Sequence, residues 1–186
     1  MNQKLIQKKH PPGNALQLQL LISAETIQER LERVARDLES KYGSEEVSIV
    51  MVLKGSFMLV ADLIRYLHLP IRVETVQVSS YGEGGIVKGE QDVVGVNALQ
   101  VEGRHILLID DIFDTGETMC ELSRKIREKE PASFTSLVLL SKDVPHNTDF
   151  RPDIALFDIE DRFVVGYGLD YKEYYRGLPD IYSIEM

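Results

Sequence analysis

The sequence predicts an α/β fold in which helices flank a central parallel sheet. Short, continuously apolar runs alternate with segments of helical periodicity, and the order strand, helix, strand occurs twice. Each such unit is a right-handed crossover between parallel strands. With 186 residues, 44% of them apolar and 27% charged, the chain has the size and composition of one globular domain with a full core.

The first crossover unit follows an amphipathic helix over residues 23–42. Its apolar side chains recur at helical spacing, at Ile27, Leu31, Val34 and Leu38. Gly43 can end the helix. Residues 47–53 then form a strand that is buried on both faces, because the run is apolar throughout. A helix that runs through residue 68 and ends before Pro70, and a strand over residues 71–78, complete the unit.

The second unit follows a glycine-rich segment. Residues 79–92 carry four glycines and no periodicity, which predicts a long loop of the kind that often closes over a site. A strand over 105–109, a helix over 119–130 and a strand over 136–140 come next. Ligands of open parallel sheets lie beyond the carboxyl ends of the strands, so the segments that follow these strands are the candidate site.

The last part of the chain has shorter segments. Residues 154–157, 163–166 and 181–184 are brief apolar runs. We expect them to form a small hood with a strand over residues 16–22, so that both chain ends contribute. The single domain then consists of a core of about 44–145 and a hood from about 1–22 and 150–186.

The segment from Leu107 to Thr118 carries the strongest chemical signal. An apolar run stops at Asp110 and Asp111, and Asp114 and Gly116 follow directly before the predicted helix. A tight turn at a helix N-terminus directs backbone N–H groups at an anion. Adjacent carboxylates would repel that anion unless a hard cation such as Mg²⁺ lies between them. A lone aspartate here would indicate a helix cap, but three carboxylates within five residues favour an anion and metal site.

Composition excludes several other classes of function. A formal net charge of −9 argues against a general nucleic-acid or acidic-membrane surface. The single cysteine allows no intrachain disulfide, and four scattered histidines form no zinc motif. No stretch is apolar enough to span a membrane. We expect a cytoplasmic protein that acts on small molecules.

At these positions the sequence resembles the type I phosphoribosyltransferases and, within them, the hypoxanthine-guanine phosphoribosyltransferases. The segment from Leu107 to Thr118 is similar to their phosphoribosyl pyrophosphate motif. Further matches occur at residues 53–56, 79–82, Lys142, and 163–176. The acidic motif marks the superfamily, whereas residues 163–176 resemble the branch that acts on 6-oxopurines.

The resemblance implies roles for the acidic segment. Asp110 and Asp111 would hold the ribose hydroxyls and a Mg²⁺ ion that bridges to the pyrophosphate. Asp114 would be the general base that accepts the proton from purine N7 as N9 attacks. The turn would cradle the 5-phosphate through backbone N–H groups and hydroxyls, from Asp114, Thr115, Gly116, Glu117 and Thr118.

It also implies roles for the other matched segments. Lys142 would donate to the 6-oxo group, Phe163 would stack on the purine, and the Val164 backbone would bind its edge. Asp170 would lie beside the base and bind a second Mg²⁺. Pyrophosphate would contact Lys54, Gly55 and Arg176, and the lid would close through Ser80 and Tyr81.

Two departures and two other functions remain open. Asp110 stands where the family commonly has Glu, and the lid contains Gly84, Gly85, Ile86, Val87, Lys88 and Gly89 where the family is usually rich in Ser, Thr and Gly. A receiver-type phosphoacceptor module also places paired aspartates after an apolar strand, and a non-catalytic nucleic-acid-binding regulator can share the fold. The resemblance implies a homodimer or homotetramer, and leaves the preference among hypoxanthine, guanine and xanthine undecided.

Overall fold

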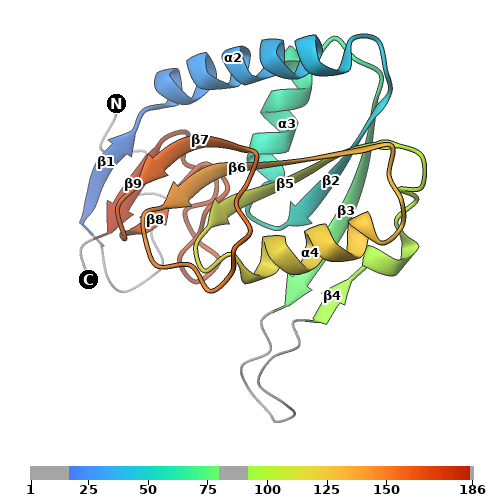
Figure 1. The fold of residues 1–186 in the computed structure, drawn as a ribbon. Helices are drawn as coiled ribbons and strands as arrows, with labels where there is room; N and C mark the ends of the chain where they lie inside the picture. The colour runs from blue at the N-terminus through green and yellow to red at the C-terminus, as the bar shows by residue number, and fades with distance from the viewer. Residues whose placement is uncertain (1–16, 80–91, 185–186) are drawn as a thin grey trace.

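A computed structural model describes residues 17–79 and 92–184, and its larger sheet has the predicted α/β architecture (Figure 1). Six strands lie in the order β4-β3-β2-β5-β6-β7. All neighbours pair in parallel except β3 and β4, which are antiparallel. The strand bounds are β2 (Val47–Leu53), β3 (Ile71–Ser79), β4 (Asp92–Val94), β5 (His105–Phe113), β6 (Ser133–Lys142) and β7 (Ile154–Ile159).

Helices cover both faces of this sheet. Helices α2 (Ala24–Tyr42) and α3 (Phe57–Tyr66) pack on one face, where they bury Ile49 and Leu107. Helix α4 (Glu117–Arg127) and the short 3₁₀ turn η1 (Val96–Ala98) pack on the other face, over Val50 and Leu108. Successive strand residues point to opposite faces, so the apolar runs of β2 and β5 supply both core layers.

The ends of α2 follow the signals seen in the sequence. The hydroxyl of Ser23 accepts a hydrogen bond from the backbone N–H of Thr26 at 3.2 Å, which caps the first turn. Gly43 ends the helix with a φ of 63°, a left-handed conformation that glycine adopts at low cost. The predicted helix over 23–42 is confirmed.

The crossover connections that follow β2 and β5 lead in opposite directions along the sheet. The crossover from β2 leads through α3 to β3 on one side, and the crossover from β5 leads through α4 to β6 on the other side. The ladder between β2 and β5 ends at Met51 and Ile109, whereas β5 remains paired with β6 as far as Phe113. A crevice between diverging strands is where open α/β sheets bind ligands.

The expected hood is a three-stranded antiparallel sheet made from both ends of the chain. Its strands lie in the order β1-β9-β8, with bounds β1 (Leu18–Ile22), β8 (Phe163–Val165) and β9 (Ile181–Ile184). One expectation was wrong in detail: residues 154–157 do not join the hood. They belong to β7, which pairs in parallel with β6 and forms an edge of the larger sheet, where Leu156 is buried under α2.

Other boundaries also differ from the prediction. Strand β4 was not predicted, and α3 ends at Tyr66 rather than at residue 68. Strand β5 continues to Phe113, because its hydrogen bonding to β6 persists beyond Ile109. The predicted lid over 79–92 falls almost entirely on residues 80–91, which lie outside the described residues, together with Ser80 and Tyr81. Within the described residues, no helix is long and apolar enough to cross a membrane.

Asp180 connects the hood to α2. It is only 3% exposed; one carboxylate oxygen accepts a hydrogen bond from the backbone N–H of Ala24 at 2.8 Å, and the other accepts one from the Tyr182 hydroxyl at 2.9 Å. The hydroxyl of Tyr182 has its pKa raised to about 12, by burial and by Asp180. Tyr182 therefore remains a neutral donor at any ordinary pH.

We expect Asp180→Ala to destabilise the protein by about 1–3 kcal/mol, because it removes the buried carboxylate that accepts hydrogen bonds from the backbone N–H of Ala24 and from the Tyr182 hydroxyl. Urea unfolding followed by circular dichroism measures this loss. Asp149→Ala, at an exposed aspartate, is the matched control and should leave the free energy of unfolding nearly unchanged. Equal stability of the two variants would contradict the assigned role of Asp180.

Candidate active site

A cavity of about 260 Å³ lies at the carboxyl ends of the strands, where β2 and β5 diverge. Its walls come from the ends of β2 and β3, from the last part of β5 and from the loop that leads into α4. The lining residues are Val52, Leu53, Val78, Asp110, Asp111, Ile112, Phe113, Asp114, Thr115, Gly116, Thr118 and Met119. The acidic segment singled out in the sequence thus forms most of this cavity.

Asp110 and Asp111 lie inside β5, not in a loop beyond it as the sequence suggested. Asp110 is 6% exposed and accepts a hydrogen bond from the backbone N–H of Asp111 at 2.9 Å. Burial, followed by the neighbouring charge of Asp111, raises the pKa of Asp110 well above its usual range. Burial also raises the pKa of Asp111, and hydrogen bonds with Asp110 and with backbone N–H groups, followed by the positive charge of Arg176, partly offset this rise. Two buried carboxylates that repel each other favour a nearby cation.

Gly55 lets the turn between β2 and α3 approach these carboxylates. A Cβ atom at Gly55 would overlap the carboxylate of Asp111, and one at Gly168 would overlap the carbonyl oxygen of Gly55. The peptide bond between Leu53 and Lys54 is cis. The backbone at Gly55 thus lies against the side chain of Asp111 and the backbone of Gly168, so three segments that are distant in sequence meet here.

The loop 114–118 forms the opposite wall. Helix α4 begins at Glu117, two residues earlier than predicted, with Gly116 as its N-cap at a φ of 84°. Gly116 is buried, and Thr115 and Glu117 are exposed. The positive end of the helix dipole therefore lies directly beside the cavity, in the arrangement that binds phosphate groups in many proteins.

Lys142 joins this loop to the end of β6. Its ammonium contacts the carboxylates of Asp114 at 3.2 Å and Asp161 at 3.1 Å, and its side chain is only 12% exposed. Burial would lower the pKa of Lys142, but the hydrogen bonds to Asp161 and Asp114 outweigh it and raise the pKa overall. Lys142 therefore remains a charged donor beside the carboxylate predicted to be the base.

Phe163 and Val164 lie on β8 of the hood. The ring of Phe163 is 37% exposed and packs edge-on against Tyr171, with ring centroids 5.6 Å apart. Val164 is buried, and its backbone pairs with Ser183. An exposed aromatic face at this position is available for stacking.

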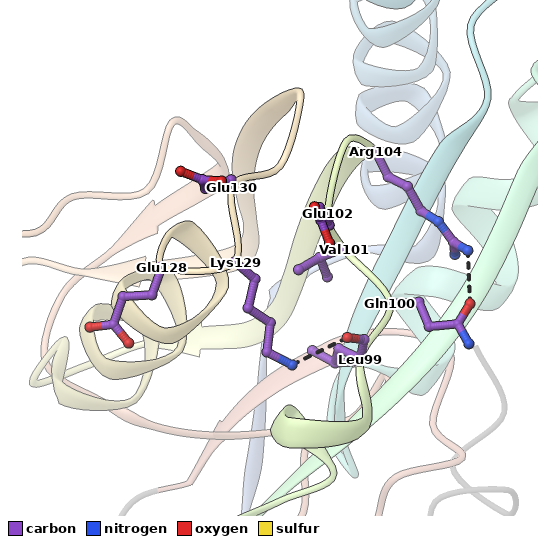
Figure 2. Close-up of a pocket in the computed structure, with 8 residues that line it drawn as sticks. All are labelled: Leu99, Gln100, Val101, Glu102, Arg104, Glu128, Lys129 and Glu130. Carbon is purple, nitrogen blue, oxygen red and sulfur yellow. Dashed lines mark hydrogen bonds between the residues drawn. The ribbon is translucent and has the colours of Figure 1, made fainter.

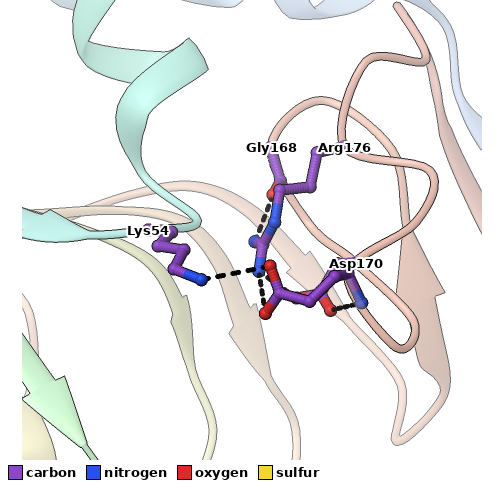
Figure 3. A network of polar contacts seen from close by, with 5 residues as sticks. Lys54, Gly168, Asp170 and Arg176 are labelled. Atoms are coloured by element: carbon purple, nitrogen blue, oxygen red, sulfur yellow. Dashed lines mark hydrogen bonds and ion pairs between the residues drawn. The ribbon is translucent and has the colours of Figure 1, made fainter.

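Asp170, Arg176 and Lys54 lie together, as Figure 3 shows. The guanidinium of Arg176 contacts Asp170 at 2.8 Å and donates to the carbonyl oxygen of Gly168 at 2.9 Å. Glu173, which the sequence reasoning missed, accepts from Lys54 at 3.1 Å and from Arg176 at 3.3 Å. These contacts, with Lys54 foremost, lower the pKa of Glu173. The predicted pyrophosphate-binding cations Lys54 and Arg176 are thus paired with Asp170 and Glu173.

The predicted metal ligands do not form one cluster. Among the described residues, no three acidic, histidine or cysteine side chains gather closely enough to hold an ion by themselves. Asp110 and Asp111 lie in the cavity, whereas Asp170 is paired with Arg176. A metal here would need substrate oxygens and water to complete its coordination, which is common for Mg²⁺.

A second cavity, of about 470 Å³, lies at a different place (Figure 2). It is formed by residues 99–104, which lead into β5, and by residues 128–130 after α4. The ammonium of Lys129 is bound there to three backbone carbonyl oxygens, and Arg104 contacts Glu74 and Gln100. Its cations are already engaged, and the segments with the chemical signals lie at the other cavity.

Comparison with known proteins identifies the family to which the chain belongs. The family model for the phosphoribosyl transferase domain matches residues 23–172. The chain belongs to the phosphoribosyltransferase family. It is therefore an enzyme of this family, and the acidic segment of β5 lies within the matched region.

Individual relatives agree over nearly the whole chain. The hypoxanthine-guanine phosphoribosyltransferase of Aquifex aeolicus is 41% identical over 90% of this chain and 95% of its own length. That of Bacillus subtilis is 38% identical over 87% and 90%. A crystal structure of a hypoxanthine-guanine phosphoribosyltransferase from Bacillus anthracis has a TM-score of 0.84 and 32% identity, and covers 92% of this chain and 100% of that one.

The raised pKa of Asp110 leads to a pH-dependent prediction. The folded protein holds this proton more tightly than the unfolded chain, in which an aspartate titrates near about 3.9. The contribution of Asp110 to stability therefore falls as pH rises above that value. We expect Asp110→Asn to be more stable than the unsubstituted protein at pH 7, and the gain to shrink toward pH 4.

Urea unfolding at several pH values measures this difference. Asp149→Asn, at an exposed position, should show no such dependence. A gain for Asp110→Asn that stays constant between pH 4 and pH 7 would show that the carboxyl is not desolvated in the folded state.

Proposed function

We propose that the protein is a purine salvage enzyme. It transfers the 5-phosphoribosyl group from phosphoribosyl pyrophosphate to N9 of hypoxanthine or guanine and releases pyrophosphate, with IMP or GMP as the product. The observation that carries this proposal is the contact between Lys142 and Asp114. A charged side chain that would suit a 6-oxo group as donor lies beside a loop and a helix N-terminus that would suit a phosphate. The names of the relatives point to the same reaction.

The 5-phosphate would bind at the N-terminus of α4. Backbone N–H groups of the loop 114–118 and the hydroxyls of Thr115 and Thr118 would donate to its oxygens. The loop lines the cavity between β2 and β5, so the ribose would lie over the end of β5, within reach of Asp110 and Asp111.

Asp114 would act as the general base. Its carboxylate is half exposed and is held by Lys142, so it is accessible to a purine that also accepts a hydrogen bond from that lysine. It would take the proton from N7 while N9 attacks the anomeric carbon. Lys142 donates but cannot accept, which favours a 6-oxo group over a 6-amino group.

The hood would hold the other side of the purine. The exposed ring of Phe163 would stack on the base, and the backbone of Val164 would bind its edge. Asp170 would lie close to the base, where its pairing with Arg176 holds it. Phe163, Val164 and Asp170 belong to the segment that lies over the carboxyl ends of the core strands.

The pyrophosphate would bind between Lys54, Gly55 and Arg176. Lys54 and Arg176 both contact Glu173, and the pyrophosphate oxygens would compete with that carboxylate for them. The paired, desolvated carboxylates of Asp110 and Asp111 fit a divalent cation, and Asp170 would hold a second one when released from Arg176. Bound Mg²⁺ would supply neutralisation of the leaving pyrophosphate.

The direct test is an assay of the purified protein with phosphoribosyl pyrophosphate, Mg²⁺ and each of hypoxanthine, guanine, xanthine and adenine. We expect nucleotide from hypoxanthine or guanine and none from adenine. Lack of turnover with both expected bases would refute the proposal. Binding of nucleic acid at low salt by a protein without turnover would instead favour a regulator on this fold.

The role of Asp114 is tested by a matched pair of variants. Asp114→Asn should lower kcat by about two to four orders of magnitude, because the amide cannot accept the N7 proton. Asp161→Asn removes the other carboxylate from Lys142 but leaves the base in place, so it should retain most of kcat. A similar loss in both variants would mean that the carboxylates act only by holding Lys142.

A further inference from the structure

A segment between β6 and β7 packs behind the proposed phosphate loop. The ring of His146 lies against the ring of Phe113, with centroids 4.7 Å apart. The side-chain amide of Asn147 donates to the carboxylate of Glu117 at 2.8 Å. The hydroxyl of Thr148 lies close under Gly116, within 2.8 Å of where a Cβ atom would stand. Residues 146–148, which are not among the residues that line the cavity, thus pack against the loop.

Three consecutive carbonyl groups of the loop are held by hydrogen bonds. The carbonyl oxygen of Asp114 lies 2.6 Å from His146 Nδ1. The carbonyl oxygen of Thr115 accepts from the backbone N–H of Asn147 at 2.9 Å, and that of Gly116 accepts from Cys120 at 3.0 Å. A carbonyl oxygen can only accept, so His146 Nδ1 must carry a proton and act as the donor.

These bonds determine where the next amides point. In a planar trans peptide the C=O and the following N–H point in opposite directions, and the peptides of this loop are not cis. The carbonyls of Asp114 and Thr115 are held by residues 146–147, and that of Gly116 is held by α4 itself. The N–H groups of Thr115, Gly116 and Glu117 therefore point away from these acceptor contacts. Thr115 and Gly116 line the cavity. Within residues 17–79 and 92–184, no hydrogen-bond acceptor is found for these three N–H groups.

We propose that His146 is a positioning residue that aims these backbone N–H groups at the 5-phosphate of the substrate. It acts through the carbonyl of Asp114 and does not contact the substrate. The inference rests on the proposed function for the identity of the anion, and on the hydrogen bonds above for the geometry. Because His146 holds the backbone of the proposed base, it also couples phosphate binding to the placement of the Asp114 carboxylate.

Two substitutions separate the hydrogen bond of His146 from its packing. His146→Phe keeps an aromatic ring against Phe113 but has no donor. His146→Asn loses the ring but carries an N–H donor on its δ atom, at the same number of bonds from the backbone as Nδ1. Thermal unfolding of both variants checks that each is folded.

The expected result is selective for the phosphate. His146→Phe should raise the KM for phosphoribosyl pyrophosphate and the Kd for IMP by about threefold to tenfold, the effect of one lost hydrogen bond. The KM for the purine base and the Kd for inosine, which lacks the phosphate, should change little. His146→Asn should restore most of the affinity for IMP. Isothermal titration calorimetry with IMP and inosine gives the two binding constants.

Other outcomes would overturn the inference. They are unchanged binding of IMP by His146→Phe, equal losses in the Phe and Asn variants, or an equal loss for inosine. Failure of the unsubstituted protein to bind IMP or turn over substrates would refute the proposed function instead. In that case inorganic phosphate, titrated into the same variants, tests the positioning role independently of the reaction.

Discussion

The site depends on one constraint, which is that β5 continues past the end of its pairing with β2. The ladder between them stops at Ile109, while β6 holds β5 in an extended conformation to Phe113. Asp110 and Asp111 therefore have a rigid backbone on one side and a crevice on the other. The turn at Gly55 can then approach Asp111, and the loop into α4 begins at a defined place.

Charge in this site is balanced locally, in a chain whose formal net charge is −9. Lys54, Lys142 and Arg176 each contact at least one carboxylate, and Asp110 and Asp111 are desolvated together. An anionic substrate with its cation would exchange these internal pairs for pairs with its own oxygens. In the absence of substrate, the internal pairs lower the cost of keeping the charges of Lys142 and Arg176 largely buried.

Local signals predicted most of the elements. Helical spacing and Gly43 predict α2, and Pro70 ends the segment that contains α3. Local sequence patterns did not predict the structure of segments in which a neighbouring strand decides whether a strand forms. Residues 154–159 form a strand of the larger sheet because β6 offers them a free edge. Strand β4 forms because β3 likewise offers it a free edge. Glu173 lies in the matched segment 163–176 but had no role assigned to it, and His146 and Asn147 carry no sequence signal beyond polar residues in a loop, so only their contacts identify all three.

The sequence alone determined the class of fold, the apolar strands and the acidic segment that marks the family, since these follow from residue spacing within short windows. The tertiary structure decided that Asp110 and Asp111 lie within β5 and share one buried environment, that Arg176 pairs with Asp170, and that His146 lies behind the phosphate loop. Each of these depends on backbones distant in sequence coming into contact. Such contacts arise from sheet order and packing, which periodicity along the chain does not encode.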